Sequence, residues 1–315
     1  MPAETHRRVI TLGEAMLQVT PSPIGPLAQA TAASLAVAGA ESTVASYLAM
    51  LGHHAIWLSA VGDDPIGERI VSEIRSAGVY TAHVQRDGFA PSGVYFKDPT
   101  SGGSTAVHYY RSGSAASRMG PDTFADFRYL RHDLVHLSGI TPALSATCAR
   151  LVESVIREAH AAHARVSFDV NFRPGLWRAE DAAGTLAELA NQADIVFVGL
   201  DEAHVLWSTA TPDDVRDVLA RPEILIVKDS SIGATAFQAS SSSFEPALPV
   251  EVVEPVGAGD AFAAGVLHGM LTEQDIFACL RFGHLLASSS LSSPGDLGPL
   301  PAELAANAER TVRDF

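Results

Sequence analysis

Short apolar runs alternate along the chain with longer stretches in which apolar residues recur every three or four positions. The longer pattern is clearest at 64–77, where it predicts a helix that ends before Gly78. The short runs have the length and composition of buried strands. The predicted strands are 9–12, 55–61, 134–137, 166–170, 195–198 and 224–227, and the predicted helices are 42–51, 64–77, 143–162, 179–190, 259–271 and 273–291.

Strands that alternate with helices favour βαβ units, and therefore a three-layer α/β/α fold with a mainly parallel central sheet. Two regions interrupt this order. Residues 15–39 are rich in Pro, Ala, Thr and Ser, and residues 81–112 contain the β-type stretches 81–85, 93–97 and 105–111. We expect both regions to contribute strands to a small inserted sheet. Such a sheet would form a lid over the carboxyl edge of the parallel sheet, where open α/β folds bind ligands.

Composition limits the classes of protein that fit this pattern. The chain has 315 residues and no evident linker, so residues 1–315 are expected to form a single domain. A net charge of −15 argues against nucleic acid or an anionic membrane as a partner. Two cysteines exclude a disulfide framework. Since neither a membrane-spanning run nor a signal peptide is evident, we expect a soluble, cytoplasmic enzyme.

The strongest chemical signal is the run VGAGDAFAAG at 256–265. It follows a strand-like stretch at 250–253 and opens an apolar helix. Small residues let a ligand approach the backbone, and the free N–H groups of a first helical turn favour an anion. Asp260 at that position is suited to accept a proton from a hydroxyl that attacks a bound phosphate. The alternative is a helix cap without catalytic function.

The run resembles the carboxyl-terminal signature of the PfkB, or ribokinase-like, carbohydrate kinases. Further matches follow in the family's order over nearly the whole chain. They are AGAESTVA at 38–45, VGDDPIG at 61–67, DVNFRP at 169–174 and GLDE at 199–202. The resemblance implies a ribokinase-like fold and ATP-dependent phosphoryl transfer to a sugar hydroxyl.

Within this family, the stretch YYRSGSAAS at 109–117 is similar to 2-keto-3-deoxygluconate (KDG) kinases. An acid sugar needs a cation for its carboxylate, and Arg111 and Arg173 are the candidates. Alternating aromatic residues on an exposed strand would explain the same pattern without a ligand. A fructokinase or another kinase of neutral sugars therefore stays open as the alternative.

The resemblance also implies roles for individual residues. Asp260 would be the general base, and the backbone N–H groups of Gly257, Ala258 and Gly259 would hold the transferred phosphate. The residues implied on the sugar side are Gly39, Tyr95, Tyr109, Arg111, Arg173 and Asp296. Those implied on the nucleotide side are Asn171, Lys228, Ser230, Gly233 and His284, with Glu202 near Mg²⁺.

The implied cofactors are ATP and Mg²⁺. A monovalent cation such as K⁺ is left open because Glu254 stands where the family usually has Asp. The resemblance further implies a homodimer formed through the lid sheet. Neither lysine follows a G-x-x-x-x-G pattern, which excludes a P-loop kinase. A Rossmann dehydrogenase fits poorly, since the glycine motif is near the carboxyl terminus. A non-catalytic sugar or nucleotide sensor is the alternative from another class.

Overall fold

The computed structural model describes residues 7–99 and 105–305. Within these residues, eight strands form a central sheet in the order β14-β13-β12-β11-β10-β9-β1-β4, and its neighbours from β12 to β4 are parallel. The strands are β1 (Arg8–Leu12), β4 (His54–Leu58), β9 (Leu134–Ser138), β10 (Arg165–Asp169), β11 (Ile195–Gly199), β12 (Ile224–Asp229), β13 (Gly233–Gln238) and β14 (Ser241–Pro246). The predicted mainly parallel sheet is confirmed.

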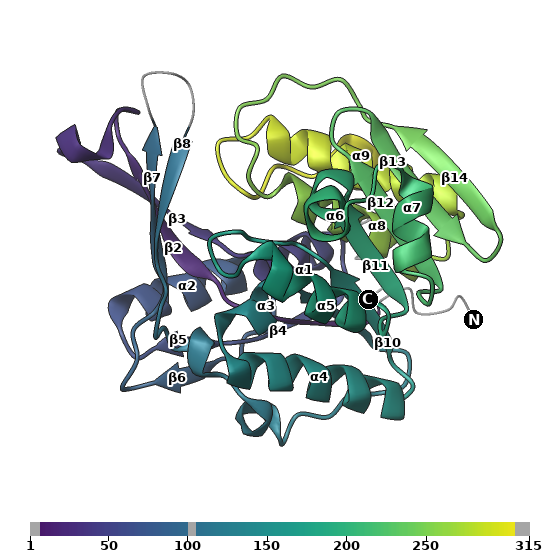
Figure 1. The fold of residues 1–315 in the computed structure, drawn as a ribbon. Coiled ribbons are helices and arrows are strands. Elements are labelled where there is room, and N and C mark those ends of the chain that lie inside the picture. Colours follow the sequence, from purple (N-terminus) through teal and green to yellow (C-terminus); the bar gives the residue numbers. More distant parts are fainter. Residues whose placement is uncertain (1–6, 100–104, 306–315) are drawn as a thin grey trace.

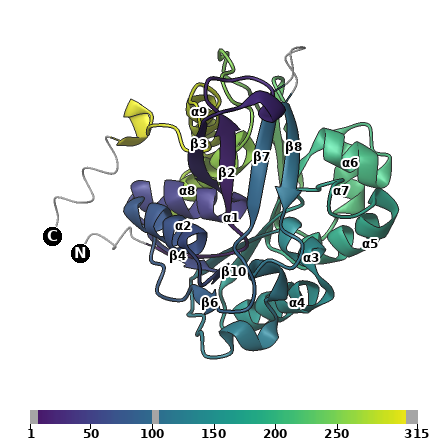
Figure 2. The same cartoon turned by 90° about the vertical axis from the view of Figure 1, so that its left-hand side faces the viewer.

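Helices cover both faces of this sheet, because its strands are apolar on both sides. Val9 packs with helices α1, α8 and α9, whereas its neighbour Ile10 packs with α4 and α5 on the other face. Figure 2 shows the two groups of helices on either side of the strands. The helices are α1 (Ala40–Met50), α2 (Pro65–Ser76), α3 (Ile140–Leu144), α4 (Ala146–Ala161), α5 (Ala179–Ala190), α6 (Leu200–Trp207), α7 (Pro212–Val218), α8 (Ala258–Leu271) and α9 (Ile276–Leu291).

A second sheet has the order β3-β2-β7-β8 and stands beside the main layers (Figure 1). Its strands are β2 (Met16–Pro21), β3 (Ala33–Ala38), β7 (Val94–Pro99) and β8 (Thr105–Tyr110). They come from both regions that lack a helical pattern, as the sequence predicts. We refer to these four strands as the lid sheet. Residues 100–104 of the predicted lid region lie outside the described residues.

Two predicted strands are wrong. Residues 81–85 do not join the lid sheet, because the chain there turns and continues into β6 (Gln85–Asp87), which pairs with β5 (Ala60–Gly62) in a separate small sheet. Residues 250–253 have no strand partner, and they form part of an extended connection between β14 and α8. The sequence analysis also missed the antiparallel hairpin of β13 and β14.

Helices α8 and α9 approach closely because small residues line their contact. A Cβ atom on Gly265 would lie 2.3 Å from the backbone oxygen of Phe282. We expect Gly265→Leu to lower the free energy of unfolding by about 3 kcal/mol or more, since neither backbone can move away easily.

Urea unfolding measures this effect, and Gly184→Ala is its control. Gly184 is exposed within α5 and its Cβ would have no neighbour within 4 Å. That change should raise the free energy of unfolding by up to about 1 kcal/mol, because Gly is a poor helix former. Equal unfolding midpoints for the two variants would contradict this account of the contact.

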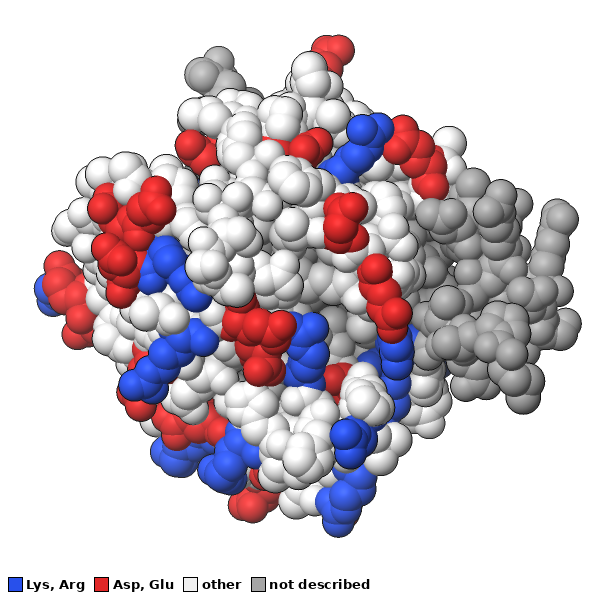
Figure 3. Space-filling model, turned by 90° about the vertical axis from the view of Figure 1, so that its right-hand side faces the viewer, with Lys and Arg blue, Asp and Glu red and all other residues white. Residues whose placement is uncertain are grey.

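Acidic and basic side chains are intermixed on the face shown in Figure 3. Exposed ion pairs such as Arg165–Glu223 and Arg281–Glu303 belong to this kind of surface. Each contributes at most about 1 kcal/mol, because water screens the charges. No helix among the described residues is long and apolar enough to cross a membrane.

Candidate active site

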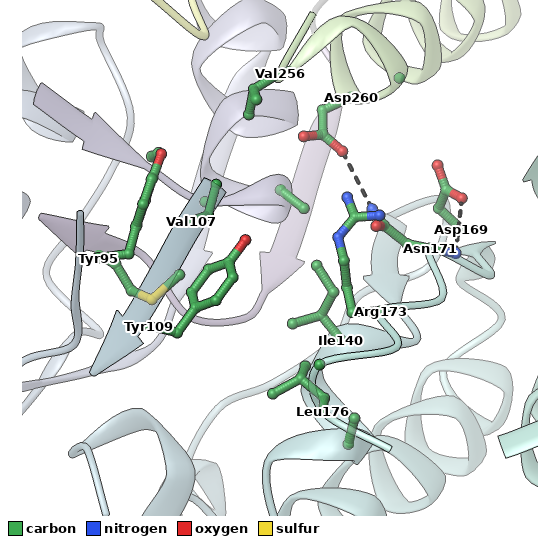
Figure 4. A pocket seen from close by; sticks show the side chains of 18 of the residues that line it. Tyr95, Val107, Tyr109, Ile140, Asp169, Asn171, Arg173, Leu176, Val256 and Asp260 are labelled. Carbon is green, nitrogen blue, oxygen red and sulfur yellow. Dashed lines mark hydrogen bonds between the residues drawn. The ribbon is translucent and has the colours of Figure 1, made fainter. Parts of the chain in front are cut away.

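A cavity of about 1120 Å³ lies between the carboxyl edge of the central sheet and the inner face of the lid sheet. Asp169 and Lys228 enter it from the ends of β10 and β12, and Tyr95 and Tyr109 enter it from β7 and β8. Figure 4 shows Tyr95 and Tyr109 on one side of the space and Asp169 with Asp260 on the other. Its volume is slightly above the usual range of about 300–1,000 Å³ for a small-molecule pocket.

The amino terminus of α8 forms one wall of the cavity. Gly257 precedes the helix with a φ of 86°, which is the left-handed region that favours glycine. A Cβ atom there would also lie 3.0 Å from the Cα and Cβ atoms of Asp296. The first N–H groups of a helix have no partner within it, and the helix dipole favours negative charge beside them. This wall is therefore suited to bind an anion.

Asp260 lies in the first turn of α8 and its side chain lines the cavity. The side-chain amide of Asn171 donates to its Oδ1 atom over 3.4 Å (Figure 4). Burial, reinforced by the nearby carboxylate of Asp169, raises the pKa of Asp260 to about 7. The positive charges of Arg173 and Lys228 oppose this shift. A carboxylate whose pKa is near neutral is well matched to accept a proton at physiological pH.

Charged residues surround this carboxylate. The Nζ atom of Lys228 donates to Oδ2 of Asp169 over 2.8 Å, and Oε1 of Glu202 lies 3.9 Å from Nη1 of Arg173. Burial works against the charge of Lys228, but Asp169 and Glu202 outweigh burial and raise its pKa. Burial also raises the pKa of Glu202. The side chain of Arg173 is 46% exposed, so its guanidinium is accessible to a ligand.

The lid sheet brings a different set of side chains to the cavity. Tyr95 and Tyr109 are register partners on neighbouring strands, and their rings lie 5.5 Å apart. Arg111 follows β8 and is buried against Glu14, whose Oε2 atom accepts from Nε of Arg111 over 2.7 Å. The remaining oxygen of Glu14 accepts from the hydroxyl of Ser114. Arg111 therefore reaches the cavity as one half of a buried ion pair.

Asp296 lines the same cavity as the lid tyrosines and has an unpartnered buried oxygen. Its Oδ1 atom has no hydrogen-bond partner among the described residues, although the residue is 8% exposed. Burial raises its pKa to about 6, and the charge of Lys97 opposes that shift. An unpartnered polar atom at a cavity wall is a candidate contact for a ligand hydroxyl.

Most of the residues that the sequence analysis proposes for the site lie together. The cavity is lined by Gly39, Tyr95, Tyr109, Arg111, Asn171, Arg173, Glu202, Lys228, Ser230, Gly257, Gly259, Asp260 and Asp296. Ala258 lies between two of these residues in the first turn of α8. Gly233 begins β13, beyond the lining residues in the described part of the chain.

His284 is the clearest departure from the sequence-based expectation. It is not among the described residues that line the cavity. Its Nε2 atom lies 3.1 Å from the backbone oxygen of Glu245, and its ring meets Phe262 edge-on at 5.0 Å. His284 therefore joins α9 to β14 and α8, and its predicted contact with the nucleotide stays a prediction.

The sequence analysis missed Glu14, Lys97 and Asp169 as residues of the site. Lys97 is two positions after Tyr95 on the same strand, so strand periodicity places both on the cavity side. Lys97 is one of only two lysines in the chain, which was an available signal. Glu14 follows the first strand directly, at the edge where ligands bind, and Asp169 ends β10 at the same edge.

Polar residues of the cavity bear on whether it can hold a metal ion. The described residues contain no cluster of three or more His, Cys, Asp or Glu side chains that could hold a metal alone. Glu202 and Asn171 nevertheless line the cavity. The Oδ1 atom of Asn171 is buried and has no hydrogen-bond partner among the residues that the structure describes. This set fits Mg²⁺ carried on nucleotide phosphates, since that ion uses few protein ligands and keeps several waters.

A helix terminus suited to an anion, with a carboxylate beside it, is the arrangement expected of a phosphotransferase that acts on an alcohol group. The model of the pfkB family carbohydrate kinases matches residues 6–303, and the chain belongs to that family. It is 33% identical over 312 residues to a 2-dehydro-3-deoxygluconokinase of Bacillus subtilis, covering 96% of each chain. A 2-dehydro-3-deoxygluconokinase of Thermoproteus tenax is 35% identical, with 96% and 93% covered.

A solved structure extends this comparison. The crystal structure of a PfkB protein from Polaromonas sp. JS666 superposes with a TM-score of 0.85 at 31% identity, covering 95% of this chain and 99% of that one. The predicted ribokinase-like fold and the similarity to KDG kinases are thus confirmed.

Proposed function

We propose that this kinase transfers the γ-phosphate of ATP to KDG, which is the 2-dehydro-3-deoxygluconate of its relatives, and releases 2-keto-3-deoxy-6-phosphogluconate. The observation that supports this proposal is that Asp260 and the amino terminus of α8 lie on one side of the cavity and Tyr95 and Tyr109 of the lid sheet lie on the other. Arg111 lines the same cavity. One side offers a base beside an anion site. The other side offers hydroxyl groups and a guanidinium, which suit an acid sugar.

Asp260 is proposed as the general base. Its carboxylate takes the proton of the sugar hydroxyl as the hydroxyl oxygen forms its bond to phosphorus. The N–H groups of Gly257, Ala258 and Gly259 hold the phosphoryl oxygens as their negative charge redistributes, and the bond to the leaving phosphate oxygen breaks. Asn171 fixes one oxygen of Asp260, which leaves the other free to face the hydroxyl.

The nucleotide is proposed to lie along the ends of β11 and β12. Lys228 and Asn171 would meet its phosphates, and Ser230 and Gly233 belong to the loop that would border it. When Mg²⁺ is bound, it neutralises charge on the phosphates, and Glu202 is the residue proposed to orient its water shell.

A monovalent cation near Glu254 stays a prediction. The ammonium group of Lys97 pairs with Oε2 of that carboxylate.

The sugar is proposed to lie between the lid and Gly39. Tyr95 and Tyr109 would hydrogen-bond its hydroxyl groups, and Asp296 would add a further partner. Arg111 and Arg173 are the proposed contacts for the carboxylate. Arg111 is oriented by Glu14, whereas the side chain of Arg173 is 46% exposed and pairs with Glu202 over 3.9 Å.

An assay of ADP release with Mg·ATP tests the proposal. The panel contains KDG, its galacto epimer, gluconate, fructose and ribose. We expect kcat/KM for KDG to exceed that for fructose by about 10- to 100-fold, since a good hydrogen bond to a charged group contributes about 1.5–3 kcal/mol. A preference for fructose would agree with the proposed phosphoryl transfer but contradict the proposal that the substrate is an acid sugar. Tight binding of sugar without any turnover would favour a sensor.

The homodimer also stays a proposal. On the outer face of the lid sheet, Tyr110 is 67% exposed and Leu35 is 45% exposed. The ring of Phe96 lies beside Tyr110 on this face, at 5.5 Å. A second copy of the chain that covers these side chains would remove an exposed apolar sheet face from water.

A further inference from the structure

One ion pair joins the lid sheet to the loop that leads into α8. Lys97 on β7 pairs with Glu254, which lies 157 residues further along the chain. The side chain of Lys97 is 5% exposed and that of Glu254 is 19% exposed. A charge pair this well shielded from water holds its geometry more firmly than a surface pair does.

Glu254 uses both of its oxygens. Oε2 meets the ammonium of Lys97, and Oε1 accepts from the backbone N–H of Val256 over 3.2 Å. Val256 directly precedes Gly257, where the chain turns into the helix with its φ of 86°. The carboxylate thus connects a lid strand to the backbone whose next three N–H groups form the proposed anion site.

Lys97 is also placed to respond to a sugar. It lines the cavity and follows Tyr95 by two positions, so both side chains leave the same face of β7. Its charge also acts on Asp296, an acid that lines the same cavity. A shift of β7 relative to the central sheet would move this ammonium and strain its pairing with Glu254.

We propose that Lys97 is a positioning residue that couples the placement of the lid to the alignment of the Gly257–Gly259 amides. It acts through Glu254 and does not touch the reacting atoms. This inference rests on the proposed phosphoryl transfer, although not on the identity of the sugar. Alignment of the anion site then depends on the lid, and a lid held over the sugar excludes water from the phosphate.

The same step can proceed with either acceptor. With sugar, the γ-phosphorus loses its bond to the β–γ bridging oxygen and gains one to the sugar oxygen, while the proton passes to Asp260. With water as the acceptor, the same bond to the bridging oxygen breaks, the phosphorus bonds to the water oxygen and a proton of the water passes to Asp260, so the products are ADP and inorganic phosphate. Loss of the coupling should therefore slow the first reaction and raise the share of the second.

The experiment compares Lys97→Met, Lys97→Arg and the double variant Lys97→Met/Glu254→Gln with the wild type. We measure kcat and KM for the sugar, and the ratio of ADP to sugar phosphate formed. In Lys97→Met we expect kcat to fall about 10- to 100-fold, KM to change less than about threefold, and the ratio to rise above one. Lys97→Arg should restore kcat to within about threefold of the wild type, because it keeps the charge.

The double variant keeps the test valid if Lys97→Met fails to fold, since it leaves no unpaired buried charge. It should show the same loss of kcat and the same raised ratio, because the two residues act as one unit. Arg165→Met is the matched control: it removes the exposed pair with Glu223 and should change neither quantity.

Two outcomes would overturn the proposal. The first is a double variant with wild-type kcat and a ratio of one, which would make the pair structural only. The second is a rise in sugar KM with kcat unchanged in Lys97→Met, which would make Lys97 a contact for the sugar. A wild-type enzyme that phosphorylates no sugar at all would instead contradict the proposed function.

Discussion

Replacement of Asp260 by Asn is expected to lower kcat by about 10²- to 10⁴-fold, the usual contribution of a positioned general base. Asn has nearly the same shape and can still meet the side-chain amide of Asn171 through its oxygen. It cannot accept the proton of the sugar hydroxyl. The expected loss therefore falls on kcat, while KM for the sugar should change little.

The pH dependence of the wild type provides a second measure of the same group. Because the pKa of Asp260 is raised to about 7, its basic form is lost as the pH falls below that value. We expect kcat to fall about tenfold per unit below pH 7 and to level off above it. In Asp260→Asn the residual rate should lose this inflection.

Stability separates a catalytic effect from misfolding. A carboxyl group with a raised pKa in the folded state binds its proton more tightly there than in the unfolded chain. Its contribution to stability is therefore present at low pH and is lost as the pH rises through about 7. At pH 8 the Asn variant should unfold at the same denaturant concentration as the wild type or a higher one. If a folded Asp260→Asn variant kept a kcat close to that of the wild type, Asp260 would not be the general base.

The elements that the sequence predicted well are those with a local cause. The parallel strands are apolar on both faces, and the glycine-rich turn at 256–259 needs a left-handed residue, so both leave a pattern that can be read along the chain. The position of Asp260 in the first turn of α8 was predicted from the same turn. The error at 81–85 has a different origin: β-type residues there were assigned to the nearest sheet, whereas a turn directs the chain to β5 instead.

The residues that the sequence did not reveal are defined by partners far along the chain. Arg111 was predicted as a contact for the sugar carboxylate, and nothing in the sequence indicated that Glu14, 97 positions away, pairs with it. Lys97 and Glu254 are separated by 157 positions. Hydrophobic patterning says nothing about which charges meet across a cavity, because that depends on how the lid sheet is placed against the central sheet.

The pair of Arg111 and Glu14 changes how acid-sugar recognition must be tested. Arg111→Met alone would leave the carboxylate of Glu14, which is 3% exposed, without its cation. Breaking a buried pair in this way typically costs about 3–5 kcal/mol, so a loss of activity could reflect a disturbed lid. Replacing both partners by neutral residues of similar size is often close to neutral for stability.

We therefore expect the double variant Glu14→Gln/Arg111→Met to fold with nearly wild-type stability and to lose its preference for acid sugars. Its kcat/KM for KDG should fall about 10- to 100-fold, which corresponds to a hydrogen bond to a charged group worth about 1.5–3 kcal/mol. For fructose, kcat/KM should stay within about threefold, because that sugar has no carboxylate to lose a partner.

Steady-state kinetics with both sugars, alongside urea unfolding of each variant, decide this prediction. Glu14→Gln alone is the informative comparison, since it keeps Arg111 and removes only the group that orients it. In Glu14→Gln we expect an intermediate loss of kcat/KM for KDG, because the guanidinium of Arg111 no longer has a charged partner and must be ordered when the sugar binds. Equal losses for KDG and fructose in the double variant would show that the pair of Glu14 and Arg111 holds the lid sheet in place and does not select the substrate. The carboxylate would then have to be recognised by Arg173, whose exposed guanidinium lies on the other side of the cavity.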